Sequence, residues 1–524
     1  MWRRIEKARL GLATLLLIGV VGCVDLEVQN PNAPDAARAL SNPGDVESLI
    51  AGSFNRWLRI TRSGGPTMFL SNVSGEHVAP WGNFGMEYYG RIPRNPTANG
   101  PGGSNVSNLN DAWTQCYRAI AAVHDGLKQI ADGAVDLGDD ELRAKAYGKF
   151  VQGLAHGSVA LLYDSGFVYD EGIDPATTEV LLQDYSAVMS AALGYLDEAI
   201  TLTGTGTFTI PETWMSHTVT SDVLEDLAYS WKARFRTAVA RTPAERQAAD
   251  WTEVVSDVNN GITTQFDIDQ SCWPHVFCED TIAWYRVVAG WSMQNNWVAG
   301  MADQSGAYQA WMNTPTLDKL AFLIITPDTR WPQGPDEATQ LDNPGEYYTV
   351  TQGSSRIWSR PDRGTWRWSY YWQPYQPFFD LTINDAGPVQ WVMMEEMEAL
   401  KAEAAYYSND MGTVAAYVNM TRDLHGLAET DAAGTNTDCV PKLPNGSCGD
   451  LWEMFKWEKR LDTQFAGPLR SGWYFDSRGW GDLMEGSLLQ FPVPYREMQL
   501  LQAQPYDLGG VGGDWGAPLG SYGY

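Results

Sequence analysis

Two stretches of the sequence place flat aromatic side chains next to amides and carboxylates. Residues 75–89 read GEHVAPWGNFGMEYY, and residues 284–297 combine tryptophans with Gln and Asn. Aromatic faces pack against the apolar C–H side of sugar rings, while nearby amide and carboxylate groups meet the hydroxyls. Both stretches are therefore predicted to bind a ligand by this chemistry. The candidate residues are Trp81, Asn83, Tyr88, Trp284, Tyr285, Trp291, Asn295 and Trp297.

Each of these rings has a competing interpretation as part of a hydrophobic core. Trp284, Trp291 and Trp297 could lie on the buried stripe of a helix. Trp81 fits a core position least, because its loop is rich in Gly and Pro. Residues 366–370, WRWSY, alternate as a strand does, which indicates either a third aromatic binding surface or a sheet packed on the rest of the chain.

The sequence lacks the common catalytic motifs. Its six histidines form no His-x-x-x-His pair, and it contains no Gly-x-Ser-x-Gly elbow, P-loop or dinucleotide fingerprint. A glycoside hydrolase needs only two carboxylates, so Glu395 with Glu396 is one possible pair. Among 64 acidic residues such a pair arises by chance, and carboxylates at the start of a helix favour its dipole. We therefore expect no enzymatic activity and no cofactor.

The composition is that of a folded and strongly acidic chain. Of 524 residues, 44% are hydrophobic and 19% are charged, and the net charge is −28. This charge repels phosphate backbones, which excludes nucleic acid as a partner and leaves neutral ligands unaffected. Tryptophan is concentrated, because 11 of the 23 fall between Trp273 and Trp391.

The first 23 residues predict a lipid anchor. A basic start, MWRRIEKAR, precedes 13 apolar residues (10–22), which is the length of a signal-peptide core and too short to span a bilayer. Residues 20–23, VVGC, resemble a bacterial lipobox, in which the cysteine becomes the lipidated first mature residue. Cys23 is thus the predicted lipid attachment site. The competing interpretation is an ordinary secretory signal that contains a cysteine.

Four other cysteines fit an oxidising compartment. Cys272 and Cys278 form one close pair, and Cys439 and Cys448 form another, as expected of disulfides that close small loops. The first pair has an alternative as a metal site with His275, but this stretch offers no fourth ligand.

The candidate ligand-binding residues are expected to be positioned by a mainly helical scaffold. Apolar residues recur at three- and four-residue steps, and consecutive amphipathic helices with short links pair antiparallel and stack as a helical-repeat solenoid. Cys116 is expected to be a buried thiol on the helix over 111–130, and Gly426 is expected to end the helix over 413–424. The expected helices span 111–130, 139–161, 185–202, 221–235, 251–262, 392–407 and 413–424.

Helical periodicity fades from 265 to 389, where Gly, Pro, Trp and Tyr crowd together. This composition indicates a large, irregular, loop-rich insertion. The predicted divisions are a lipoprotein signal peptide (1–22), a tether with the first helical-repeat part (23–264), the aromatic-rich insertion (265–390), a helical pair that completes the scaffold (391–428) and a mixed C-terminal region (429–524).

Six segments, in order along the chain, resemble motifs of the SusD/RagB family of surface lipoproteins. The stretch 467–472 departs from the family pattern, and so does the tail, which lacks the common Asn-Pro-Gly-Tyr ending. The matching segments are LEVQNPN (26–32) followed by a first helix over 46–60, WTQCYRAI (113–120), the helical pair within 398–427, EKR (458–460), WYFDSR (473–478) and FPVPYRE (491–497).

This resemblance implies a tetratricopeptide-like scaffold with an irregular binding face and a SusD-like C-terminal region. It implies a lipid-anchored, surface-exposed protein of the outer membrane that binds a nutrient, an oligosaccharide or a peptide, and passes it to a SusC-type TonB-dependent transporter. It also implies that Arg460, Asp476 and Arg478 are buried, paired ions rather than catalysts. The alternatives are a surface glycan-degrading hydrolase and a structural lipoprotein without a small ligand.

Overall fold

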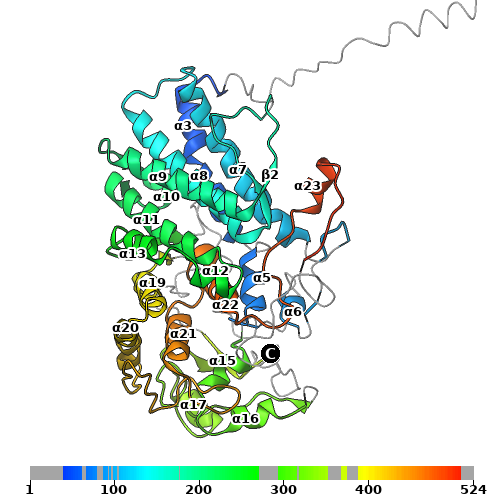
Figure 1. Ribbon diagram of the computed structural model, residues 1–524, viewed down its shortest axis with the longest axis vertical. Helices are drawn as coiled ribbons and strands as arrows, with labels where there is room; N and C mark the ends of the chain where they lie inside the picture. Colours follow the sequence, from blue (N-terminus) through cyan, green and yellow to red (C-terminus); the bar gives the residue numbers. More distant parts are fainter. Residues whose placement is uncertain are drawn as a thin grey trace, which may run out of the picture.

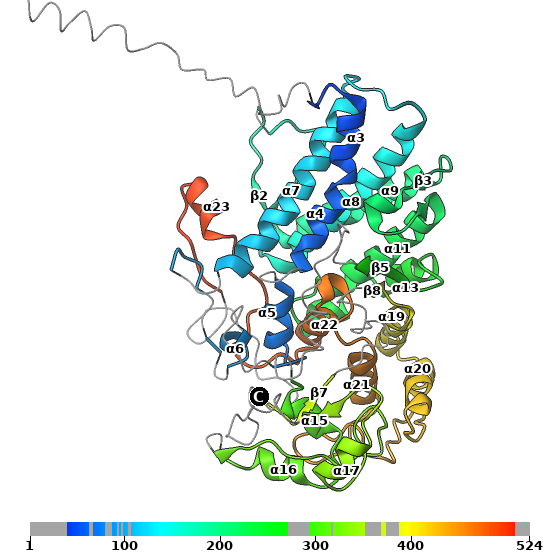
Figure 2. The same ribbon diagram turned by 180° about the vertical axis from the view of Figure 1, so that it is seen from behind.

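The computed structural model places long helices at one end of the molecule and short helices with irregular chain at the other (Figures 1 and 2). The predicted signal peptide and Cys23 lie outside the residues that it describes. These are 39–61, 66–78, 86–91, 94–95, 98–102, 106–175, 177–270, 293–315, 318–351, 368–373 and 387–508.

The long helices come from the first half of the chain, and α8 is their centre, with α7, α9 and α11 packed around it. Two glycines allow this close packing: a Cβ at Gly153 would lie 2.6 Å from Leu196, and one at Gly157 would lie 2.3 Å from Phe235. The helices are α3 (Pro43–Ala51), α4 (Ser53–Leu58), α5 (Pro66–Val73), α7 (Val106–Ala131), α8 (Glu141–Leu162), α9 (Tyr185–Thr203), α11 (Ser221–Ala238) and α13 (Trp251–Asn259).

Shorter elements connect these helices. Strands β1 and β2 pair antiparallel, as do β3 and β4, so each pair closes a link between helices. The elements are α6 (Met86–Tyr89), α10 (Glu212–Met215), α12 (Pro243–Gln247), β1 (Ser165–Phe167), β2 (Leu182–Asp184), β3 (Thr209–Ile210) and β4 (Val219–Thr220).

The stack of helices continues near the C-terminus with α19 (Met394–Tyr407), α20 (Met411–Leu424) and α21 (Leu451–Asp462). In the series α7, α8, α9, α11, α13, α19, α20 and α21, each helix packs against the next, and α13 meets α19 directly. The predicted mainly α fold is confirmed. A tetratricopeptide-like repeat stays a prediction, as do the predicted domain divisions.

The aromatic-rich part leaves and rejoins the scaffold at neighbouring points. Strand β5 (Phe266–Gln270) pairs antiparallel with β8 (Gly387–Val392). Between them, the described part forms a second hydrophobic core that includes Trp331, Tyr348 and Tyr371. Its elements are α15 (Asn296–Met301), α16 (Ala307–Met312), α17 (Glu337–Asp342), β6 (Thr349–Val350) and β7 (Tyr371–Trp372).

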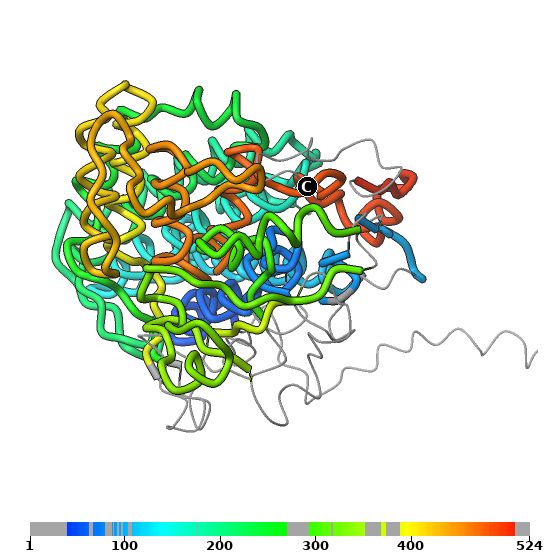
Figure 3. The backbone as a smooth tube through the Cα atoms, turned by 90° about the horizontal axis from the view of Figure 1, so that it is seen from below, coloured from blue at the N-terminus to red at the C-terminus, as the bar shows by residue number. Residues whose placement is uncertain are grey.

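The C-terminal segment runs back along the scaffold. Helix α22 (Gly472–Trp480) packs against α5, α11 and α12. Further on, the Phe491 N–H donates to the Leu162 carbonyl at 2.6 Å, and α23 (Tyr495–Leu500) follows. Seen from below, this last described part (red) lies on the side opposite α20 (yellow; Figure 3). The C-terminal segment thus contacts the end of α8.

The helix ends agree in part with the sequence-based expectation. The first helix, expected over 46–60, is broken at Gly52 into α3 and α4. Helix α11 is capped by Thr220, whose side chain accepts from the Val223 N–H. Gly426 has a φ of 70° directly after α20, so its predicted role as a helix stop is confirmed.

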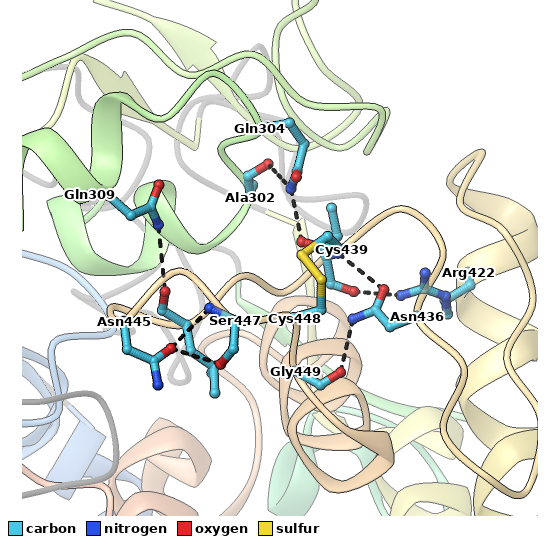
Figure 4. The surroundings of a disulfide bond; sticks show 12 residues. Ala302, Gln304, Gln309, Arg422, Asn436, Cys439, Asn445, Ser447, Cys448 and Gly449 are labelled. Carbon is cyan, nitrogen blue, oxygen red and sulfur yellow. Dashed lines mark hydrogen bonds between the residues drawn. A yellow bond between two sulfur atoms is a disulfide. The ribbon is translucent and has the colours of Figure 1, made fainter.

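The disulfide predicted between Cys439 and Cys448 is present (Figure 4). It closes a loop between α20 and α21, where the Cys439 carbonyl accepts from Gln304 Nε2 at 2.8 Å. Cys116 is a buried free thiol on α7, which confirms its predicted place. The pair at 272 and 278, with its alternative as a metal site, lies outside the described residues.

Candidate functional site

Three aromatic-rich segments that are far apart in sequence meet at one place. Val78, after α5, forms a bridge with Met293, in which each N–H donates to the other's carbonyl at 2.8 Å. Asn295 forms a second bridge with Trp368. Val78, Met293 and Trp368 pack together, and the half-buried Trp372 packs against them. We call these five residues the aromatic junction.

Hydrogen bonds to main-chain carbonyls hold the junction in place. The Gln294 N–H donates to the Tyr371 carbonyl at 2.8 Å, and Ser369 donates to the Gln294 carbonyl from N–H and Oγ at 3.1 and 2.7 Å. Asn296 Nδ2 donates to the Trp368 carbonyl at 3.1 Å. The junction is therefore a fixed base, as a binding site requires.

A buried polar network supports the junction from the C-terminal part of the chain. The Glu76 carbonyl accepts from Gln464 Nε2 and from Gln294 Nε2, both at 3.1 Å. Gln464 Oε1 in turn accepts from the Tyr348 hydroxyl. Buried polar groups are stable when they are hydrogen-bonded in this way, so the network ties the loop after α5 to the end of α21.

The structure describes three of the eight predicted ligand-binding residues. Asn295 is only 1% exposed, and its Oδ1 caps α15 by accepting from the Trp297 N–H at 3.0 Å. Trp297 lies in the second core, edge-on to Trp311. Tyr88 is half-buried on α6, edge-on to Tyr89. Of the three, Asn295 belongs to the junction and Trp297 to the second core, whereas the partly exposed Tyr88 packs against the core of the long helices.

The other five predicted residues lie outside the described part of the chain. Four of them have a junction residue as their nearest described neighbour, because Val78 is three residues before Trp81 and Met293 is two residues after Trp291. The nearest described neighbour of Asn83 is Met86. Ligand contact by any of the eight residues stays a prediction. The five residues are Trp81, Asn83, Trp284, Tyr285 and Trp291.

Sequence reasoning missed two residues of this region. Trp372 belongs to the aromatic run YYWQPYQPFFD, whose density is a signal that could have pointed to it. Gln464 has no such signal, because its partner Glu76 is 388 residues away in the sequence.

The expected buried ion pairs are confirmed for Arg460 and Asp476. Arg460 Nη2 donates to Asp482 at 2.7 Å. Asp476 lies 2.9 Å from Arg246 and 2.8 Å from Lys459. Arg460 is buried and the Asp476 side chain is 13% exposed, so both lie largely inside the protein, as the structural interpretation of the charged motifs requires.

The expected ion pair of Arg478 is wrong. Its buried guanidinium pairs with no carboxylate among the described residues and donates instead to four main-chain carbonyls, those of Leu161, Ala238, Ala240 and Leu489. The physical reason is that carbonyls at the ends of α8 and α11 carry partial negative charge and replace a carboxylate.

Glu395 and Glu396 occupy different environments. Glu396 is buried and accepts from Arg234 Nε at 3.0 and 3.1 Å, whereas Glu395 is exposed. A glycosidase requires two carboxylates that flank one sugar bond. Because Glu396 is held by Arg234, this neighbouring pair lacks that arrangement.

The part of the chain that the structure describes lacks two features, a membrane-spanning helix and a metal-binding cluster. Within this part, no helix has both the length and the apolar character needed to cross a membrane. Across the same residues, there is no group of three or more His, Cys, Asp or Glu side chains that could hold a metal ion.

Comparison with solved structures places this arrangement among known folds. A SusD superfamily protein from Bacteroides fragilis matches with a TM-score of 0.51 and 14% identity, over 89% of this chain and 99% of its own. A SusD-like protein from Bacteroides fragilis NCTC 9343 matches with a TM-score of 0.50 and 14% identity, over 84% of this chain and 86% of its own. This chain has a SusD-like fold.

The SusD-like fold thus extends over most of the chain. No family model matches the sequence, and the search of curated proteins finds no match. At 14% identity, the likeness to the SusD-like structures concerns the path of the backbone and assigns no binding side chain.

Proposed function

We propose that this protein is a lipid-anchored, surface-exposed binding protein of the outer membrane. It captures an oligosaccharide at the aromatic junction and passes it to a SusC-type TonB-dependent transporter. The observation that carries the proposal is the meeting of three aromatic-rich segments, at Val78, Met293 and Trp368, on one hydrogen-bonded base.

The chemistry of the junction favours a neutral, ring-shaped ligand. Trp372 keeps part of its surface exposed, and Trp81 follows Val78 by three residues. Aromatic surfaces fixed on a rigid base bind the apolar faces of sugar rings without a large ordering cost. The net charge of −28 disfavours anionic ligands and leaves uncharged sugars unaffected.

The transporter is inferred from the resemblance to SusD/RagB proteins, and the anchor from the lipobox-like VVGC at 20–23. Two acyl chains anchor a protein stably, since each buried methylene contributes about 0.8 kcal/mol. Isolation of the native lipoprotein with its partners tests this part. Co-purification of a TonB-dependent transporter is the expected result. Metabolic labelling with a fatty acid tests the anchor, and labelling that persists when Cys23 is replaced would contradict it.

A glycan and peptide array tests the ligand. We expect binding of an oligosaccharide that is lost in Trp81→Ala and retained in Trp452→Ala, whose tryptophan stacks on Tyr406 at the scaffold. A peptide as the sole ligand, or no ligand at all, would contradict the proposal, and the latter would favour a structural lipoprotein. Reducing-sugar release that disappears when a carboxylate pair is mutated would favour a hydrolase.

A further inference from the structure

A cleft of about 220 Å³ lies on the scaffold between the start of α19, α20, the end of α21 and the strands β7 and β8. Glu395, Leu424 and Gln373 are among its lining residues. Gln464 also lines it, so the cleft adjoins the polar network beneath the aromatic junction. We call it the α20 cleft. Its volume is below the usual range for drug-sized ligands, which points to a ligand of amino-acid size.

Most hydrogen-bond donors of the α20 cleft are already used within the protein. Four of the lining side chains donate to protein oxygens, and His425 Nδ1 lies 2.6 Å from Glu346. The four donations are from Tyr347 to Asp462 at 3.2 Å, Thr421 to Val418 at 2.9 Å, Gln390 to Gln265 at 2.8 Å and Gln464 to Glu76 at 3.1 Å.

Acceptors of the cleft, in contrast, keep unused capacity. Glu395 is exposed and forms no ion pair with a described residue. Gln373 is only 8% exposed, yet its Oε1 accepts no hydrogen bond from the part of the chain that the structure describes. No Lys or Arg is among the described residues that line the cleft. The lining Asp462 carboxylate already pairs with Arg330 and His425, so Glu395 is the carboxylate that can meet a ligand. A free acceptor beside the unpaired carboxylate of Glu395 favours a ligand that donates hydrogen bonds and carries positive charge.

The rim of the cleft is aliphatic. Met420 and Leu424 lie one turn apart on α20 and are 57% and 72% exposed. Leu461 forms part of the wall behind them and is buried. Neighbouring exposed aliphatic side chains gain stability when an apolar group covers them.

We propose that the α20 cleft binds a small aliphatic primary amine. The ammonium group donates to Glu395 and Gln373, and the aliphatic part covers Met420 and Leu424. This site is separate from the oligosaccharide site proposed above and does not depend on it, because no residue of the aromatic junction lines the cleft.

The test is isothermal titration of the full chain with leucinamide and with N-acetyl-leucinamide at low salt. The two probes share the isobutyl group, but only leucinamide carries an ammonium group. We expect leucinamide to bind at least about tenfold more tightly, because the acetylated probe has lost its charge-assisted hydrogen bonds. Equal affinities, or no binding of leucinamide in the millimolar range, would overturn the proposal.

Three variants locate the binding site. Glu395→Gln is expected to weaken leucinamide about fivefold, as for an exposed charge pair, and Leu424→Asn about threefold through lost apolar contact. Glu398→Gln is the matched control, since Glu398 lies on the same helix, pairs with Lys401 and does not line the cleft. All these side chains are at least partly exposed, so folding should be retained. Equal effects of Glu395→Gln and Glu398→Gln would contradict the assignment.

Discussion

Arg241 and Arg478 donate hydrogen bonds to the same carbonyl, that of Leu161 at the end of α8, at 2.7 and 3.0 Å. Both guanidinium groups are buried, and neither forms an ion pair with a described carboxylate. Arg478 also reaches carbonyls within 238–240, at the end of α11. Helix C-termini stabilise cations, so the two arginines join the ends of scaffold helices to the C-terminal segment.

Replacing Arg478 by Met should therefore lower the free energy of unfolding by about 3 kcal/mol, because the variant leaves buried carbonyls without donors. Urea unfolding followed by circular dichroism measures this change. Arg496→Met is the control, since Arg496 is exposed on α23 and its loss should cost less than about 0.5 kcal/mol. Similar losses in the two variants would contradict the role of Arg478.

Gly157 on α8 should not tolerate a methyl group. Its Cβ would lie 2.3 Å from the Phe235 ring, so Gly157→Ala is expected to destabilise the protein by about 1–3 kcal/mol through overpacking. Gly194→Ala on α9 meets no atom within 4 Å and should be neutral or stabilising by up to about 1 kcal/mol. Thermal unfolding of both variants checks the packing of α8 against α11. A stabilised Gly157→Ala would show that these helices are farther apart.

His156 should make the protein sensitive to acid. Burial lowers its pKa to about 4, from 6.5. The unfolded chain then binds a proton that the native chain does not, so stability falls as the pH drops below 6.5, by up to about 3 kcal/mol near pH 4. In urea unfolding between about pH 7.5 and 4.5, His156→Gln should lose less stability than the original protein. An identical pH dependence would be inconsistent with a buried, neutral His156.

His425 should act in the opposite direction. Burial lowers its pKa, but the Asp462 and Glu346 carboxylates outweigh this effect and raise the pKa above 6.5. The stability that it contributes is complete below pH 6.5 and is lost as the pH rises through the raised value. His425→Asn should therefore destabilise the protein more at about pH 6 than at about pH 8.5 in urea unfolding. A larger effect at the higher pH would contradict this assignment.

The helical scaffold was predictable because the periodicity that indicates a helix is carried by residues close together in the sequence. The periodicity of Trp113, Tyr117 and Ile120 predicts α7, and the lone Gly426 predicts where α20 ends. The disulfide between Cys439 and Cys448 was predictable for the same reason, since its cysteines are 9 residues apart.

The junction and the arginine contacts could not be predicted, because their partners are distant in sequence. Val78 meets Met293 only after the chain has formed helices α7 to α13, and no pattern near either residue indicates the other. The ion pair expected at Arg478 failed for a related reason. Sequence shows that a buried cation needs acceptors, but not whether carboxylates or helix-end carbonyls provide them.

The central claim is that segments around Trp81 and Trp372 form one oligosaccharide site. A double-mutant cycle tests it most directly, with titration calorimetry of the array-identified oligosaccharide against Trp81→Ala, Trp372→Ala and the double variant. Each single substitution should weaken binding at least about tenfold, and the two effects should be non-additive by about 1 kcal/mol. An unchanged Kd in either single variant, or strictly additive effects, would contradict a single shared site.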